Sequence, residues 1–157
     1  KRSWTYRHVL WLGHTHGIEI RMPASHPYNP LAHLRLAVAT SDDGTISRLV
    51  AETIFRHVWR GGEEAADPAR LAALTGQLKP KRDANSDESK ALLKRNTDEA
   101  LQQGVFGTPT YVVDGRLFWG FDGLQMLRAY LSGDAWFDGP QWTSADQRPS
   151  LLRSSKN

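Results

Sequence analysis

The sequence predicts an α/β fold in which a block of helices is inserted between two halves that contain strands. Three patterns support this prediction. Apolar residues alternate near the N-terminus, helical patterns fill the middle of the chain, and two strand-like runs meet at an Asp-Gly pair further on. With 157 residues, of which 39% are hydrophobic, the chain suits one domain with a sizeable core.

The N-terminal part predicts a helix followed by a short strand. Aromatic side chains recur at helical spacing over residues 1–14, and Gly17 supplies a stop. The stretch IEIRMP, residues 18–23, alternates apolar and polar side chains and ends in a proline, which predicts a strand. Since a βαβ opening needs about 30 residues or more, we expect its first strand and the beginning of its helix to precede Lys1.

The middle of the chain predicts four helices. Asn29 followed by Pro30 is a start signal for the first, Asp67 caps the third, and Ser86 starts the fourth. The second has the clearest pattern, an apolar face with i, i+3, i+4, i+7 spacing. The expected helices cover residues 31–40, 46–59, 69–78 and 87–103.

The C-terminal part predicts a hairpin and a further helix. TYVVD and RLFWG are strand-like runs that meet at Asp114-Gly115, a strong signal for a two-residue turn. Asp122 is expected to cap the helix GLQMLRAYL, which Gly133 closes. The tail is expected to be irregular. Its aromatic residues should pack on the body, and its polar end should be mobile.

Composition excludes several functions. The 20 Lys and Arg are scattered and the net charge is only +3, which argues against a nucleic-acid face and weakly favours small anionic ligands. No apolar run is long enough to span a membrane, so we expect no membrane partner. The chain has 0 Cys and therefore no thiol nucleophile of its own. His14 and His16 do not share a helix face, so no metal site is expected.

Pro109, directly before the hairpin, predicts a ligand contact. Cis peptide bonds are almost confined to X-Pro and usually mark functionally placed turns, so we predict a cis Thr108–Pro109 bond. Such a turn would leave the N–H and C=O groups of Thr108 unpaired, and they could pair with an extended peptide. The alternative is a trans proline that starts the strand and blocks edge pairing.

These motifs also carry a family resemblance. GTPTYVVDG with its hairpin and helix resembles the C-terminal half of the thioredoxin fold, and the helical block resembles that of the DsbA-like branch. RNTDEALQQGVFGTPTYVVDGRLFWGFDGLQML, HPYNPLAHLRLA and ADPARLAAL are similar to the 2-hydroxychromene-2-carboxylate isomerases and kappa-class glutathione transferases. The resemblance runs from Lys1 to about Gly139. It implies a thioredoxin-like fold with a DsbA-like all-helical insertion, without the N-terminal βα portion.

The resemblance also implies a domain organisation. The expected domains are a partial thioredoxin-like domain at residues 1–23 and 104–133, a helical insertion at 24–103 and a C-terminal tail at 134–157.

The family's binding residues can be carried over by position. In that family glutathione lies extended, and its cysteinyl backbone pairs with the residue before the cis-proline, which is Thr108 beside Pro109 here. Phe121, Asp122 and Gly123 would meet the γ-glutamyl end, with helix N–H groups for its carboxylate and the Asp122 carboxylate for its ammonium. The alternative is that Asp122 only caps its helix.

Three further residues resemble substrate-binding positions. Lys1 and Trp4 match a Lys-x-x-aromatic pair, in which the lysine would hold a carboxylate of glutathione or of an organic acid. An exposed, solvated lysine is the alternative. Asn29 matches a position that lies close to the substrate in relatives. The alternative is that Asn29 only caps its helix.

The resemblance implies a cytoplasmic, glutathione-dependent isomerase of an aromatic hydroxy acid, which acts by reversible addition of the glutathione thiolate. The family's catalytic serine would lie upstream of Lys1, so no catalytic residue is assigned and the chain as written is expected to be inactive. The alternatives are a DsbA-like thiol-disulfide oxidoreductase with an upstream Cys-x-x-Cys and a non-catalytic binding module. Aromatic residues around Phe55 and Trp59 suggest a possible homodimer.

Overall fold

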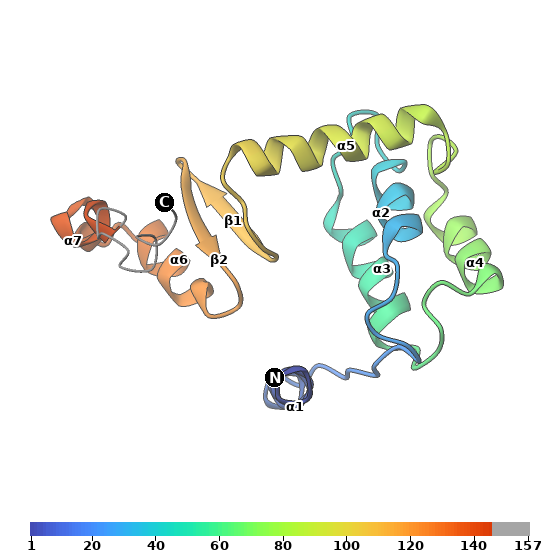
Figure 1. The fold of residues 1–157 in the computed structure, drawn as a ribbon, viewed down its shortest axis with the longest axis horizontal. Helices are drawn as coiled ribbons and strands as arrows, with labels where there is room; N and C mark the ends of the chain where they lie inside the picture. Colours follow the sequence, from blue (N-terminus) through green and yellow to red (C-terminus); the bar gives the residue numbers. More distant parts are fainter. Residues whose placement is uncertain (146–157) are drawn as a thin grey trace, which may run out of the picture. The chain divides into compact units, whose positions relative to one another are not determined.

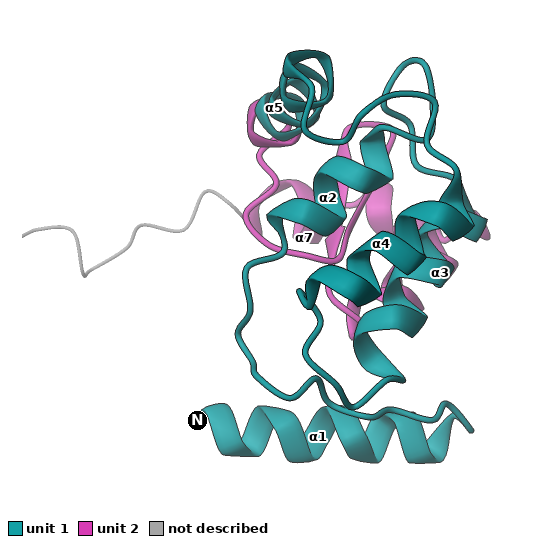
Figure 2. Cartoon of the chain, turned by 90° about the vertical axis from the view of Figure 1, so that its right-hand side faces the viewer, with its two compact units in different colours: residues 1–99 teal, residues 100–157 magenta. Residues whose placement is uncertain are grey.

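The structure is a computed structural model that describes residues 1–145. It divides into two compact units (Figure 2): unit 1, Lys1–Glu99, and unit 2, which begins at Ala100. The joining of residues 1–23 with 104–133 in one thioredoxin-like domain stays a prediction. Within the described part of the chain, no helix is long and apolar enough to cross a membrane.

All regular secondary structure in unit 1 is helical. Its core lies where α3 packs on α2 and α4, around buried side chains such as Leu36, Val58 and Leu74. Phe55, one of the aromatic residues that suggested a homodimer, is exposed on α3. The homodimer itself stays a prediction. The helices are α1 (Arg2–Thr15), α2 (Leu31–Val38), α3 (Arg48–Trp59), α4 (Pro68–Leu78) and α5 (Asp87–Gln102) (Figure 1). The last three residues of α5 belong to unit 2.

The predicted starts of α4 and α5 are confirmed by local hydrogen bonds, whereas α2 ends at Val38 and α3 begins at Arg48, both inside the predicted ranges. The Asp67 carboxylate accepts the N–H of Arg70 at 3.0 Å, and the Ser86 hydroxyl accepts the N–H of Ser89 at 3.2 Å. Gly17, after the end of α1, has a φ of +66°, a left-handed conformation that glycine adopts without strain. These signals act within a few residues, which is why the sequence alone was enough to place them.

The strand predicted for residues 18–23 does not form, and that prediction is wrong. The N–H of Ile18 bonds to the Gly13 carbonyl at 2.8 Å, and the N–H of Arg21 bonds to the Trp59 carbonyl at 2.7 Å. Both acceptors belong to helices. A strand needs a ladder of bonds to a neighbour, and no described residue of unit 1 belongs to a strand. Alternation of side chains could not supply that neighbour.

Unit 2 contains the predicted hairpin. Strands β1 (Thr110–Val113) and β2 (Arg116–Trp119) pair antiparallel, and they form a two-stranded sheet. Asp114 and Gly115 have φ values of 50° and 73°, as a two-residue turn with positive φ at both positions requires. Helix α6 (Gly123–Leu131) packs on β2.

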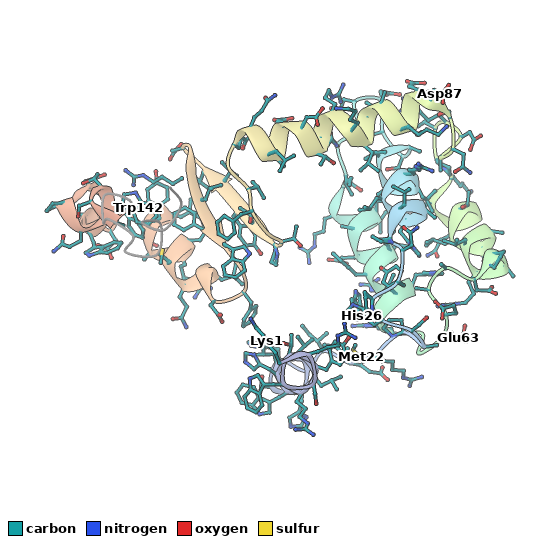
Figure 3. All side chains as sticks on the ribbon, viewed as in Figure 1. Lys1, Met22, His26, Glu63, Asp87 and Trp142 are labelled. Atoms are coloured by element: carbon teal, nitrogen blue, oxygen red, sulfur yellow. The ribbon has the colours of Figure 1, made fainter. Side chains whose placement is uncertain are left out.

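The C-terminal segment is more regular than expected. It forms the 3₁₀ helix η1 (Ala135–Asp138) and helix α7 (Pro140–Thr143), where the sequence predicted irregular structure. The predicted packing of its aromatic residues is confirmed, since Phe137 is buried and Trp142, labelled in Figure 3, stacks 6.0 Å from Phe118. The polar end, predicted to be mobile, lies outside the described residues.

Candidate ligand-binding site

The segment before β1 presents the backbone of Thr108. The Thr108–Pro109 bond is cis, as predicted. The Pro109 carbonyl accepts the N–H of Gly120 at 2.8 Å, and the Thr110 hydroxyl donates to the Gly107 carbonyl at 2.5 Å. Within residues 1–145, the N–H and C=O groups of Thr108 have no hydrogen-bond partner, and the residue is exposed. Its neighbours are thus fixed while its own backbone groups stay available.

Asp122 lies at the start of α6 with its carboxylate exposed. The prediction that it caps the helix is wrong, because the side chain makes no cap hydrogen bond. Its φ of −65° and ψ of −26° are already helical, whereas the capping residue Ser47 has an extended ψ of 156°. Among the described residues the carboxylate has no hydrogen-bond or ion-pair partner.

A tight turn satisfies part of the helix N-terminus. The Gly123 N–H donates to the Gly120 carbonyl at 3.3 Å, and the Leu124 N–H donates to the Phe121 carbonyl at 3.1 Å. Gly120, with a φ of +80°, makes the turn possible. The expected row of bare N–H groups is therefore reduced, although the N–H of Asp122 has no backbone acceptor in the described chain.

The bond between Pro109 and Gly120 joins the two segments of this site. On one segment Thr108 offers a backbone donor and acceptor, which suit an extended peptide-like ligand. On the other Asp122 offers an unpartnered carboxylate, which suits an ammonium group. Unit 2 thus contains complementary groups for a small peptide-like ligand with a free amino end. We call Thr108, Pro109, Phe121, Asp122 and Gly123 the unit 2 site.

The predicted substrate-binding residues lie in unit 1. Lys1 immediately precedes α1 and Trp4 is in its first turn, and both are exposed. The predicted Asn29 cap is not found, because Pro30 takes the N-cap position of α2 without a side-chain cap; the Asn29 side-chain oxygen instead accepts the N–H of Leu31 at 3.0 Å, just before the helix. Contact of these three residues with a substrate stays a prediction.

Sequence reasoning missed a contact between α1 and the loop that carries Asn29. The Tyr6 hydroxyl lies 2.9 Å from Nδ1 of His26 and 3.3 Å from its carbonyl oxygen, and the two rings meet edge to face. His26, labelled in Figure 3, also lies against Trp59 of α3. The residues are 20 positions apart, so only tertiary structure brings them together.

Replacing Asn29 by Ala is expected to lower the free energy of unfolding by about 1 kcal/mol, because the Leu31 N–H loses its acceptor. Asn29→Asp should retain nearly full stability, since a carboxylate accepts the same bond. Urea unfolding of the three proteins measures this. Equal stability of the alanine variant would show that the Asn29 bond does not stabilise α2.

Residues 6–132 match the DSBA-like thioredoxin domain, and the chain therefore belongs to this family. Among curated proteins it is similar to a 2-hydroxychromene-2-carboxylate isomerase of Sphingobium xenophagum, with 29% identity over 82 residues. That match covers 49% of this chain and 42% of the relative, so it spans less than half of the relative's length.

A solved structure of a 2-hydroxychromene-2-carboxylate isomerase, in its selenomethionine form, matches with a TM-score of 0.69 and 19% identity. It covers 94% of this chain and 70% of that chain. The chain is thus a mostly helical DsbA-like thioredoxin-fold domain with few strands.

Proposed function

We propose that the protein acts in the glutathione-dependent isomerisation of an aromatic hydroxy acid of the 2-hydroxychromene-2-carboxylate type. The observation that carries the proposal is the unit 2 site, where Thr108 has unpaired backbone groups and Asp122 an unpartnered carboxylate. The similarity to isomerases of this substrate supports the choice of reaction.

The unit 2 site fits the two ends of a γ-glutamyl-cysteinyl ligand. Thr108 pairs through its backbone with the cysteinyl residue, as one strand pairs with another. Asp122 accepts hydrogen bonds from the γ-glutamyl ammonium, and its own N–H faces the adjoining carboxylate. A charge-assisted bond of this kind contributes about 1.5–3 kcal/mol. Pro109 and Gly123 hold the two segments in place, and Phe121 borders the γ-glutamyl end.

When bound, glutathione supplies a thiolate that adds reversibly to a conjugated carbon of the substrate. The residues of this chain bind and orient. Lys1 holds the substrate carboxylate and Trp4 packs on the aromatic ring. The Asn29 oxygen is engaged with Leu31, so its amide NH₂ is the group that donates to the substrate.

The test is a calorimetric titration of the protein containing this chain with glutathione, followed by an absorbance assay with 2-hydroxychromene-2-carboxylate. We expect glutathione to bind and to be required for interconversion of the isomers. Thr108→Ala is a matched control, since it keeps the backbone and should change the affinity by no more than about two-fold.

Each alternative function gives a different outcome. Glutathione binding without interconversion would overturn the isomerase and leave a glutathione-binding domain. Reduction of a disulfide substrate would favour a thiol-disulfide oxidoreductase. A protein that neither binds glutathione nor reacts would be a non-catalytic binding module.

A further inference from the structure

A buried histidine and a half-buried one in unit 1 share one acceptor. Nε2 of His33, on α2, lies 3.1 Å from the Ala65 carbonyl oxygen, and Nε2 of His57, on α3, lies 2.9 Å from the same atom. The ring centroids are 5.3 Å apart. His33 is 2% exposed and Ala65 is 0% exposed. Because a carbonyl oxygen only accepts, both rings carry a proton on Nε2.

The second nitrogen of His33 has no partner. Nδ1 is buried and makes no hydrogen bond within residues 1–145. In the neutral ring with Nε2–H this atom is a bare lone pair, which the core tolerates at modest cost. A proton on Nδ1 would create a charged donor with no acceptor and no access to water, which is far less favourable. The geometry therefore requires a neutral imidazole at position 33.

The groups around His33 also disfavour a positive charge. Arg70, on α4, donates to the carbonyls of His57 at 2.8 Å and Glu64 at 2.7 Å, so its guanidinium adds positive charge nearby. The nearby carboxylates are engaged, Glu63 with Arg70 at 2.9 Å and Glu64 with the hydroxyl of Ser25. The Tyr28 ring lies 5.5 Å from the His33 ring, and burial raises the pKa of Tyr28, so its hydroxyl stays neutral.

Burial, followed by the charges of His57 and Arg70, lowers the pKa of His33 below its ordinary value, while the bond to Ala65 acts in the opposite direction. A histidine whose pKa is lowered in the folded protein makes its full contribution to stability at pH values above its pKa in the unfolded chain, about 6.5. That stabilisation is lost as the pH falls below 6.5 towards the folded pKa.

We propose that His33, His57 and the Ala65 carbonyl form an acid-sensitive clamp. It holds α2, α3 and the loop between α3 and α4 together while His33 is neutral, and it opens when His33 takes up a proton. Since opening binds one additional proton, the equilibrium constant for opening rises up to about ten-fold for each pH unit below 6.5. The carboxyls with lowered pKa values, Asp43, Glu52 and Asp87, titrate at lower pH and do not contribute in this window.

The test is urea unfolding of the full chain between pH 7.5 and pH 5, compared with His33→Gln. The glutamine amide can still donate to Ala65 but cannot take up a proton. His14→Gln is the matched control, because it removes an exposed histidine on α1. Between pH 6.5 and 5.5 the folding equilibrium constants of the wild type and of His14→Gln should fall. The factor of this fall should be several-fold larger than for His33→Gln.

Equal pH dependence of all three proteins would overturn the clamp. If His33→Gln does not fold, a titration of the wild-type imidazole resonances decides instead. The clamp requires the His33 ring to stay neutral well below pH 6.5 while the protein is folded. A folded protein in which His33 titrates at its ordinary pKa would refute the proposal.

Discussion

Replacing Asp122 by Asn is expected to weaken glutathione binding roughly ten-fold or more, because a loss of about 1.4 kcal/mol is a factor of ten. The variant keeps the size and shape of the side chain but loses the charge that the γ-glutamyl ammonium would meet. Thermal stability should be nearly unchanged, since the carboxylate makes no cap hydrogen bond. Even Asp122→Ala should therefore lose less than the ~1 kcal/mol of an ordinary cap.

Asp134→Asn is the control for Asp122. Asp134 lies in the same unit, and its carboxylate accepts the N–H of Trp136 at 3.0 Å. The substitution removes the same charge, and asparagine caps about as well as aspartate. Calorimetric titration should therefore show reduced glutathione affinity in Asp122→Asn only. Equal affinities in the wild type and both variants would remove Asp122 from the site, and equal losses would indicate an effect of net charge.

Phe118→Ala is expected to lower the free energy of unfolding by about 3–5 kcal/mol, the usual range for a buried phenylalanine. Phe118 is 1% exposed on β2. Its ring centroid lies 5.5 Å from that of Tyr130 and 6.1 Å from that of Phe137. The substitution would leave a cavity where α6 and the C-terminal helices meet the sheet.

Phe106→Ala is the matched control for Phe118. Phe106 belongs to the same unit but is 71% exposed and contacts Trp119 at a centroid distance of 5.3 Å. Its replacement should change the unfolding free energy by no more than about 1 kcal/mol. Urea unfolding monitored by tryptophan fluorescence measures both variants. Similar losses from the two substitutions would show that the aromatic cluster around Phe118 is not the core of unit 2.

The sequence alone determined the features that depend on neighbouring residues. The start of α4 at Asp67-Pro68, the turn at Asp114-Gly115 and the cis bond before Pro109 were all predicted and are confirmed. Each rests on backbone preferences or hydrogen bonds that span only a few positions. Such signals act whatever the rest of the chain does, so one sequence suffices to read them.

Tertiary structure decided the features that need a distant partner. Residues 18–23 alternate as a strand would, but their backbone bonds go to Gly13 and Trp59, and alternation cannot create a neighbouring strand. Asp122 has the residue type of a cap, yet the turn at Gly120 gives it a helical backbone and leaves its carboxylate unpartnered.

The pairing of His33 with His57 is the clearest case of such dependence. The two residues are 24 positions apart, and both contact a carbonyl from a third segment, at Ala65. Neither histidine carries a sequence signal that distinguishes it from an ordinary packing residue. Burial keeps the His33 ring neutral and the shared acceptor places its proton on Nε2, and both conditions exist only after α2, α3 and the following loop have packed together.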